Sequence, residues 1–140
     1  MIYILDGMSA SGKSTYAKSL GLPIKKITLN TLEEVIAELS EKDDVVYDRF
    51  LNIYYLSKDE AIQINDYLLS NKNCSCKLFI CDLEAGWNRV VELGKPIPRW
   101  KYESTYNSCN AIKSYLTAYE VVNIDSKSLA KTGKASRNKI

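Results

Sequence analysis

Histidine is absent from this sequence of 140 residues, and cysteine occurs only at Cys74, Cys76, Cys81 and Cys109. Without histidine, a zinc site built from cysteine and histidine ligands is excluded. Cys74 and Cys76 are two positions apart, which is neither the spacing of a CxxC redox pair nor a useful zinc spacing. We therefore expect free thiols, buried or half-buried, in a reducing compartment.

The sequence also lacks a strong charge of one sign and a long hydrophobic run. Lys and Arg number 19 against 17 Asp and Glu, and the net charge of +2 is too small for a nucleic-acid coat or a polybasic membrane anchor. No window approaches the roughly 20 apolar residues of a membrane span. The apolar start, residues 2–5, is too short for a signal peptide and has no basic segment before it. We expect a soluble, cytoplasmic protein with no membrane partner.

What is present is the composition of one ordinary globular domain, 46% hydrophobic and 26% charged. Short apolar runs alternate with segments of helical spacing, which implies an α/β fold whose parallel sheet is covered on both faces. The runs predict strands at residues 2–6, 26–29, 45–47, 77–81 and 120–124. The helical segments are 13–20, 32–39 with Asn30 or Thr31 as its cap, 51–56, 61–69, 84–93 and 104–118.

Polar residues gather where these strands end. Asp6, Asp48, Asp82 and Asp125 each lie at the carboxyl end of a predicted strand. Ligands of parallel sheets bind beyond the carboxyl ends of the strands, so these positions predict one polar rim where a ligand binds.

The segment after the first strand, residues 7–14, reads Gly-Met-Ser-Ala-Ser-Gly-Lys-Ser and fits the P-loop pattern G-x-x-x-x-G-K-[ST]. Its glycines let successive N–H groups turn toward a phosphate, and the following helix directs its positive end to the same oxygens. Lys13 is expected to bridge the β- and γ-phosphates, and Ser14 to bind Mg²⁺. The predicted cofactors are ATP and Mg²⁺, held by Gly7, Ser9, Ala10, Ser11, Gly12, Lys13, Ser14 and Thr15.

Two further groups of charged residues fit phosphoryl transfer. Asp48 is a candidate catalytic base or Mg²⁺ ligand, and Arg49 can grip a phosphate of the acceptor with two hydrogen bonds. Asp6 can orient the substrate or an Mg²⁺-bound water. Asp82 either reaches Mg²⁺ through water or caps the next helix.

A basic cluster near the middle of the chain predicts a flap that would exclude water from the phosphates. It contains Arg89 and, in a proline-bearing loop, Lys95, Arg99 and Lys101. Arg89 and Arg99 are the preferred catalytic candidates, because a guanidinium stays charged when desolvated. Among the aromatic residues that can stack on a base, those nearest the expected acceptor side are Phe50, Tyr54 and Trp100.

The sequence resembles the thymidylate kinases and the wider group of nucleoside and nucleotide kinases. The resemblance lies in the P-loop, in Asp48-Arg49-Phe50 at the end of the third strand, and in the later lid and strand. The resemblance covers residues 2–126. It implies a three-layer αβα P-loop kinase fold with a five-stranded parallel sheet in the order 2-3-1-4-5. It also implies a kinase domain over residues 1–126 with a lid at about 89–103, and a homodimer. Residues 127–140 form a basic tail that we expect to be partly disordered.

The leading functional hypothesis is a (deoxy)nucleotide or nucleoside kinase that transfers the γ-phosphate of ATP to a nucleoside monophosphate or nucleoside. The main alternative is a polynucleotide 5′-hydroxyl kinase, whose partner would be a nucleic-acid 5′ end. A kinase of another small metabolite is a third reading. A regulator that binds nucleotide without turnover is the non-enzymatic alternative.

Overall fold

A computed structural model describes residues 1–8, 11–40, 43–71 and 73–124. Its strands are β1 (Ile2–Gly7), β2 (Ile24–Lys25), β3 (Val45–Tyr47), β4 (Cys74–Cys81) and β5 (Tyr119–Ile124). Its helices are α1 (Lys13–Ser19), α2 (Leu32–Leu39), α3 (Lys58–Ser70), α4 (Leu83–Glu92) and α5 (Arg99–Ile112). The predicted tail and Asp125 lie outside the described residues.

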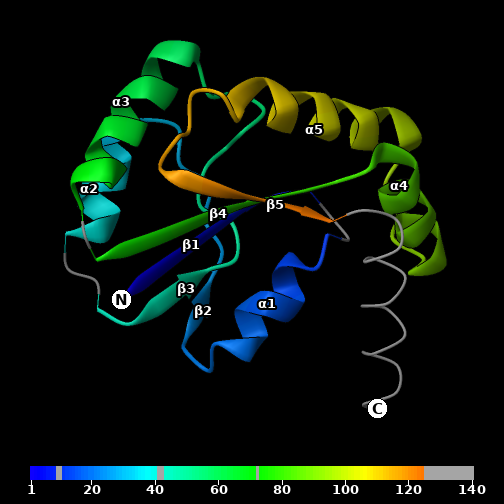
Figure 1. The fold of residues 1–140 in the computed structure, drawn as a ribbon, viewed down its shortest axis with the longest axis horizontal. Coiled ribbons are helices and arrows are strands. Elements are labelled where there is room, and N and C mark those ends of the chain that lie inside the picture. The colour runs from blue at the N-terminus through cyan, green and yellow to red at the C-terminus, as the bar shows by residue number, and fades with distance from the viewer. Residues whose placement is uncertain (9–10, 41–42, 72, 125–140) are drawn as a thin grey trace.

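The five strands form one parallel sheet in the order β2-β3-β1-β4-β5, which confirms the predicted fold class and strand order (Figure 1). β1 lies at the centre, where Ile2 is in register with Val45 of β3 on one side and with Cys74 of β4 on the other. The carboxyl ends of β1 and β3 therefore lie side by side, and the segments that follow them meet at that edge.

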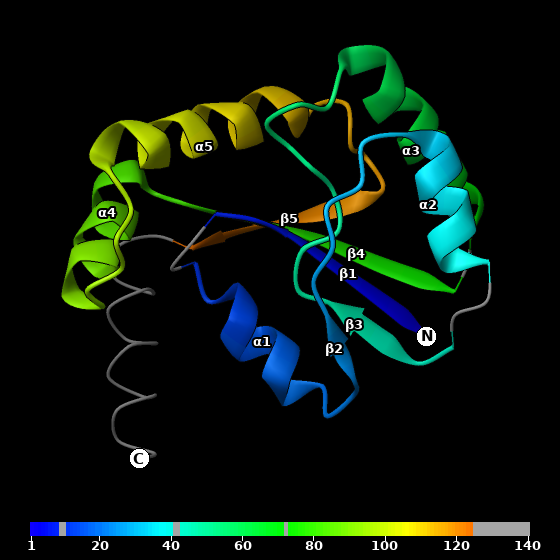
Figure 2. The same ribbon diagram turned by 180° about the vertical axis from the view of Figure 1, so that it is seen from behind.

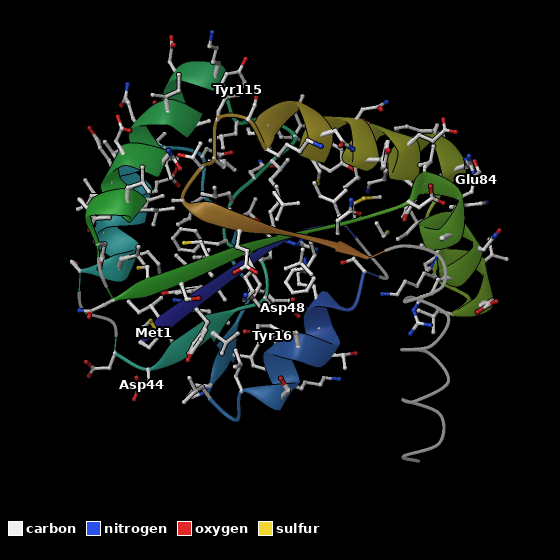
Figure 3. The ribbon with its side chains drawn as sticks, in the orientation of Figure 1. Met1, Tyr16, Asp44, Asp48, Glu84 and Tyr115 are labelled. Atoms are coloured by element: carbon white, nitrogen blue, oxygen red, sulfur yellow. The ribbon has the colours of Figure 1, made fainter. Side chains whose placement is uncertain are left out.

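Helices cover both faces of the sheet, so the molecule has three layers (Figures 1 and 2). Strand residues alternate between the faces. Ile2 and Ile4 join the larger core with buried residues of α2, α3, α4 and α5. Leu5 joins a smaller core with Ala17 of α1. On this smaller side Tyr16 packs against Phe79, with ring centroids 5.8 Å apart (Figure 3).

Three helices begin at a side-chain cap that satisfies a free backbone N–H. Thr31 caps α2 in a reciprocal capping box with Glu34, which decides between the two predicted caps. Ser57 caps α3. The Asp82 carboxylate accepts a hydrogen bond from the Ala85 N–H at 3.1 Å, so it is the cap of α4.

Two predicted elements near the start of the sheet are wrong. The second strand is Ile24–Lys25, whereas residues 26–29 run beside residues 49–52, with a single bridge between Leu29 and Leu51. Residues 51–56 form bridge and turn structure instead of a helix. Their local apolar spacing is helical, but long-range hydrogen bonds take the backbone groups at the start of this segment.

The helix predicted at 104–118 begins earlier and ends earlier, as α5. Pro98 precedes its first residue, and the Pro98 carbonyl accepts hydrogen bonds from the N–H groups of Lys101 and Tyr102 at 3.1 Å each. Proline is tolerated at a helix start because the first N–H groups have no partner within the helix. Arg99 is therefore the first residue of a helix and not part of the preceding loop.

The four cysteines are free thiols as predicted; Cys76, Cys81 and Cys109 are buried and Cys74 is half-buried. Within the described ranges, none of the helices has the length and apolar character needed to cross a bilayer.

Replacing Gly7 with alanine should strongly destabilise the fold. Gly7 has φ of 136°, and an added Cβ would lie 2.1 Å from the carbonyl oxygen of Phe79, so β1 and β4 would have to separate. We expect Gly7→Ala to lower the free energy of unfolding by about 3 kcal/mol, measured by urea denaturation. Gly21 has φ of 66° with open space around it, so the matched Gly21→Ala variant should lose only about 1 kcal/mol. Equal losses would contradict this account.

Candidate active site

The chain after β1 turns sharply into α1 and leaves the start of that helix uncapped. Gly12, with φ of 86°, precedes the helix, and α1 has neither a side-chain cap nor an acidic residue in its first turn. The Ser11 hydroxyl donates to the Met8 carbonyl at 2.6 Å, which holds the turn together. The free N–H groups at the start of α1 therefore suit an anion. Ser9 and Ala10 lie outside the described residues.

A cavity of about 180 Å³ lies against this turn, and we call it the phosphate cavity. Five of its residues were predicted as P-loop ligands, and it also collects basic side chains from separate parts of the chain. It is lined by Met8, Ser11, Gly12, Lys13, Ser14, Thr15, Lys26, Asp48, Arg49, Arg89, Leu93 and Lys95.

Asp48 faces the phosphate cavity from the end of β3 with an unsatisfied oxygen. Its Oδ2 accepts a hydrogen bond from the Ser14 hydroxyl at 2.9 Å. Asp48 is only 5% exposed, and its Oδ1 is buried without a hydrogen-bond partner among the described residues. Lys13 Nζ lies 4.0 Å from Oδ1, and Lys26 Nζ lies 3.8 Å from Oδ2.

Ser14 and Asp48 together fit a magnesium site. A buried carboxylate oxygen with no donor is costly unless something binds it, and carboxylate and hydroxyl oxygens suit Mg²⁺. In the described part of the chain, no cluster of three metal-binding side chains occurs. A cation here would be completed by phosphate oxygens and water, which is the usual way in which proteins hold Mg²⁺ with a nucleotide.

Lys13 is largely buried between the two aspartates. Burial lowers the pKa of Lys13, and the charges of Asp6 and Asp48 act in the opposite direction. Arg49 adds repulsion that lowers the pKa further. When the positive charge of a buried ammonium is only partly balanced by nearby carboxylates, the site favours the binding of an anion beside it.

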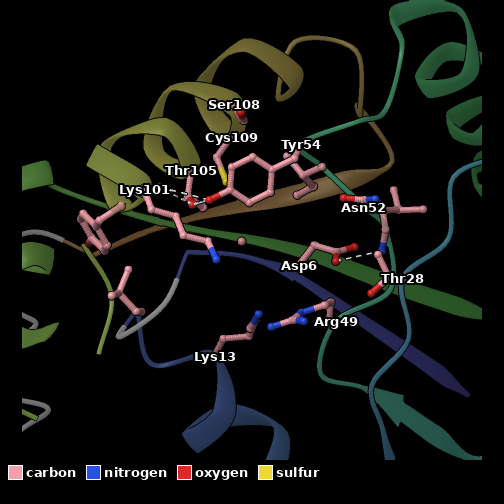
Figure 4. Close-up of a pocket in the computed structure, with 15 residues that line it drawn as sticks. Asp6, Lys13, Thr28, Arg49, Asn52, Tyr54, Lys101, Thr105, Ser108 and Cys109 are labelled. Carbon is pink, nitrogen blue, oxygen red and sulfur yellow. Dashed lines mark hydrogen bonds between the residues drawn. The ribbon is translucent and has the colours of Figure 1, made fainter. Parts of the chain in front are cut away.

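A second cavity of about 300 Å³ opens on the other side of Lys13, and we call it the acceptor cavity (Figure 4). Figure 4 shows Lys13 and Arg49 beside one another, with the ammonium of Lys101 pointing toward them. Lys13 and Arg49 line both cavities. The acceptor cavity is lined by Asp6, Gly7, Lys13, Thr28, Arg49, Leu51, Asn52, Ile53, Tyr54, Ile97, Lys101, Tyr102, Thr105, Ser108 and Cys109.

Arg49 occupies this junction with an unusual backbone. Its φ is 147°, a value that residues other than glycine rarely adopt. Its carbonyl accepts a hydrogen bond from the Ile27 N–H at 3.1 Å. Strained residues of this kind persist only where the surrounding structure holds them, and they concentrate at functional sites.

Asp6 lies under the same turn, and its carboxylate is bound on both oxygens. Oδ1 accepts from the N–H groups of Phe50 and Leu51 at 2.9 and 3.1 Å, and Oδ2 accepts from the Tyr119 hydroxyl at 2.8 Å. Burial raises the pKa of Asp6, and these hydrogen bonds together with Lys13 oppose that rise. In this structure Asp6 holds the backbone and does not contact Ser14 or Asp48 through any hydrogen bond described.

The predicted aromatic residues separate into three environments. Tyr54 lines the acceptor cavity, donates to the Lys101 carbonyl at 3.1 Å and contacts the Thr105 hydroxyl. Phe50 is fully buried against Tyr47, and Trp100 is 71% exposed. Only Tyr54 of these three therefore lines either of the two cavities described.

The two predicted lid arginines differ in position. Arg89 lines the phosphate cavity together with Lys95. Arg99 forms ion pairs with Glu84 and Glu103 and lies over the ring of Trp87, 5.4 Å from its centroid. In Figure 3, Glu84 lies on α4 well apart from Asp48. Arg99 therefore joins α4 to α5 in this structure and lines neither of the two cavities.

Sequence reasoning did not find most of the acceptor cavity. Thr28, Asn52 and Ser108 lie in segments without a motif, and no local pattern marks them. The helical spacing of Lys101, Thr105 and Ser108 was the one available signal, and it was hidden because the start of α5 was misplaced.

Comparisons with known proteins place this fold among P-loop proteins. No family model matches the sequence, and no curated protein matches it either. The chain is similar to the YorR protein of Bacillus subtilis in complex with phosphorylated GDP, with 20% identity, a TM-score of 0.64, and coverage of 96% of this chain and 92% of that one. It is similar to deoxyadenosine kinase of M. mycoides with bound dATP at 12% identity, a TM-score of 0.54 and coverage of 99% and 100%.

A third similar structure is shikimate kinase of Bacteroides thetaiotaomicron, with 11% identity, a TM-score of 0.50 and 98% of each chain covered. At these identities the likeness shows the fold alone. The shared fold is that of P-loop nucleoside and small-molecule kinases, and it is not specific to thymidylate kinases.

Replacing Asp48 with asparagine should remove the magnesium dependence of nucleotide binding. The amide keeps the size and can still accept from Ser14, but it lacks the charge that a cation requires. Affinity is measured in fluorescence titrations with a labelled ATP analogue, with and without Mg²⁺. We expect the gain in affinity on adding Mg²⁺ to be smaller in Asp48→Asn than in the unchanged protein, by roughly tenfold or more.

The matched control is Asp82→Asn, because Asp82 was, like Asp6, another predicted contact of Mg²⁺ or its water, and the structure places it at the cap of α4. Asparagine is a good cap, so this variant should keep the full magnesium effect. The assignment to Asp48 is refuted if the two variants respond alike.

Proposed function

We propose that this chain is an ATP-dependent phosphotransferase that binds the triphosphate in the phosphate cavity and the acceptor in the acceptor cavity. The observation that carries the proposal is that Lys13 and Arg49 line both cavities. A phosphoryl group in flight spreads negative charge over its oxygens, and catalysis consists of positioning and charge stabilisation. Two cations at the junction are placed to stabilise a group that passes from one cavity to the other.

Each residue of the phosphate cavity has a role in this proposal. The free N–H groups at the start of α1 and the ammonium of Lys13 bind the phosphates, and Ser14 and Asp48 hold Mg²⁺. The bound Mg²⁺ would neutralise phosphate charge. Arg89 and Lys95 add positive charge to the wall of the cavity. Arg99 would join them as a lid residue only after releasing Glu84 and Glu103.

The acceptor is proposed to be a nucleoside or nucleotide. The acceptor cavity has the size of a small-molecule site, and its walls combine apolar side chains with hydrogen-bonding groups. Tyr54 supplies an aromatic ring, and Asn52 and Ser108 supply polar groups, as a base and a sugar require. Similar structures hold dATP, dCTP and phosphorylated GDP, which supports this class of ligand.

Within this class, the lining favours a monophosphate over a free nucleoside. Transfer to a hydroxyl needs a base near the hydroxyl, whereas transfer to a phosphate needs cations. Lys13, Arg49 and Lys101 supply cations to the acceptor cavity. Asp6 is the one carboxylate among the described residues that line it, and both of its oxygens already accept hydrogen bonds.

The proposal is tested by incubating the protein and ATP–Mg²⁺ with nucleosides, nucleoside monophosphates and a 5′-hydroxyl oligonucleotide, with products read by chromatography. We expect a monophosphate to yield two diphosphates. Labelling of the oligonucleotide, with binding that weakens steeply as salt rises, would favour the polynucleotide kinase instead. Nucleotide binding without any product would overturn the proposal and favour a regulator or a kinase of another small metabolite.

Lys13→Ala should abolish transfer in the same assay. Removing the ammonium leaves the β- and γ-phosphates without their central cation, and we expect kcat to fall by about 10³-fold. Lys18 is a basic residue in the last turn of α1 and lines neither cavity, so Lys18→Ala is the matched control and should keep near-normal turnover. Full activity of Lys13→Ala would rule out this mechanism.

Arg89→Ala should reduce kcat more than Arg99→Ala. The Arg89 guanidinium already lines the phosphate cavity, whereas Arg99 is bound by two carboxylates on exposed surface. We expect a loss of roughly 10²-fold for Arg89→Ala and a loss of about threefold for Arg99→Ala. A larger loss for Arg99→Ala would contradict this prediction. It would show that the lid rearranges during the reaction so that Arg99 contacts the phosphates.

A further inference from the structure

We propose that Asp6 is a positioning residue for phosphoryl transfer, which it supports by holding the strained turn that places Arg49 between the two cavities. The inference rests on the proposed function and deepens it. It starts from a gap in the sheet. β1 and β3 pair only as far as Ile4 and Tyr47, so the backbone of β1 does not pair with the residues beyond β3.

The Asp6 side chain replaces that strand. One oxygen of its carboxylate accepts from the N–H groups of both Phe50 and Leu51, the two residues directly after Arg49. Both of these hydrogen bonds are buried, so leaving the two N–H groups without an acceptor would be costly. The carboxylate itself is 1% exposed, so water cannot readily substitute for it.

The other side of the turn is held by the last residue of β2 and by the segment after it. The N–H of Asp48 donates to the Lys25 carbonyl at 2.8 Å, and the carbonyls of Arg49 and Phe50 accept from Ile27 and Leu29 at 3.1 and 3.0 Å. Arg49 is thus fixed at its carbonyl by one segment, and its successors are fixed at their N–H groups by Asp6. Bonds on both sides hold the φ of 147°, which an arginine would not adopt freely.

Tyr119 fixes the carboxylate in turn. Its hydroxyl donates to Asp6 Oδ2 at 2.8 Å from the first residue of β5, two strands away from β1. Figure 4 shows the result, with Asp6 against the backbone of the turn and the Arg49 side chain directed toward Lys13. Loss of the Asp6 acceptor should therefore move the Arg49 guanidinium, and shifts of about 1 Å at a reacting centre can cost about 10²-fold in rate.

A double-mutant cycle tests this coupling. We expect Asp6→Ala to lower kcat by about 30- to 100-fold with a smaller effect on KM for ATP. In an Arg49→Ala background, the same change should cost less than about threefold, because the residue through which Asp6 acts is already gone. Asp6→Asn retains an oxygen acceptor for the two N–H groups, and its amide N–H can donate to the Tyr119 hydroxyl oxygen, so it should restore kcat to within about fivefold of the unchanged protein.

The matched control is Asn65→Ala. Asn65 is also a buried polar side chain that accepts a backbone N–H, from Ala118 at 2.7 Å, and donates to the Thr117 hydroxyl, but neither of these hydrogen bonds reaches residues 49–51. Its loss should lower the unfolding midpoint without a selective fall in kcat. Independent, multiplicative effects of Asp6→Ala and Arg49→Ala would overturn the inference, as would an equal fall in kcat for Asn65→Ala.

A second measurement does not depend on turnover and also serves if Asp6→Ala is poorly folded. In NMR spectra, Tyr119→Phe should increase amide exchange at Phe50 and Leu51 and shift the side-chain Nε resonance of Arg49. Unchanged exchange together with an unchanged Arg49 resonance would refute the inference. If the unchanged protein transferred phosphate to no acceptor, the proposed function would fail, while these spectra would still decide whether Asp6 holds Arg49.

Discussion

The pairing of β1 with a strand on each side is the constraint on which the site depends. Because β1 is central, the turn into α1, the end of β3 and the end of β4 all meet at one edge of the sheet. Gly7 permits a close approach of β1 to β4, since a side chain there would collide with the backbone of β4. The two aspartates and the two cations of the site come from elements that this pairing brings together, and a change in strand order would separate them.

The charges at that edge are balanced only in part. The phosphate cavity gathers Lys13, Lys26, Arg49, Arg89 and Lys95, against the carboxylate of Asp48. Cations held close together in a partly buried site repel one another, and an anion placed among them relieves the repulsion. Asp48 cannot satisfy all of them, and its own buried Oδ1 has no hydrogen-bond partner in the described structure. Under the proposed function, a magnesium-bound triphosphate would bring the negative charge that these cations lack and a divalent cation for the Asp48 carboxylate.

The P-loop and the polar strand ends could be read from the sequence because each depends on residues adjacent in the chain. Gly7 to Ser14 forms a motif, and Asp48-Arg49 follows a short apolar run, so their place at the rim of the sheet was predictable, whereas the strand order came from the family resemblance. Residues 51–56 were misread as a helix because the acceptor for the Leu51 N–H is Asp6, 45 residues earlier. A pattern of local spacing contains no information about a partner so distant. The engagement of Asp6 by Tyr119, which links the first and last strands, was invisible for the same reason.

The acceptor side was harder to predict because its inner helix face is polar. Lys101, Thr105 and Ser108 are spaced by four and three positions, so they lie along one face of α5 and line the acceptor cavity. A helix whose inward stripe includes a lysine and hydroxyl groups lacks the apolar period that usually reveals a helix. Tyr102, Cys109 and Ile112 of α5 belong to the core, and Tyr102 and Cys109 also line the acceptor cavity. Lys101, Thr105 and Ser108 line the cavity without belonging to the core. Under the proposed function, substitutions along that stripe would change the acceptor while the sheet and the P-loop stay as they are, in keeping with a fold that this chain shares with a deoxyadenosine kinase and a shikimate kinase at 11–12% identity.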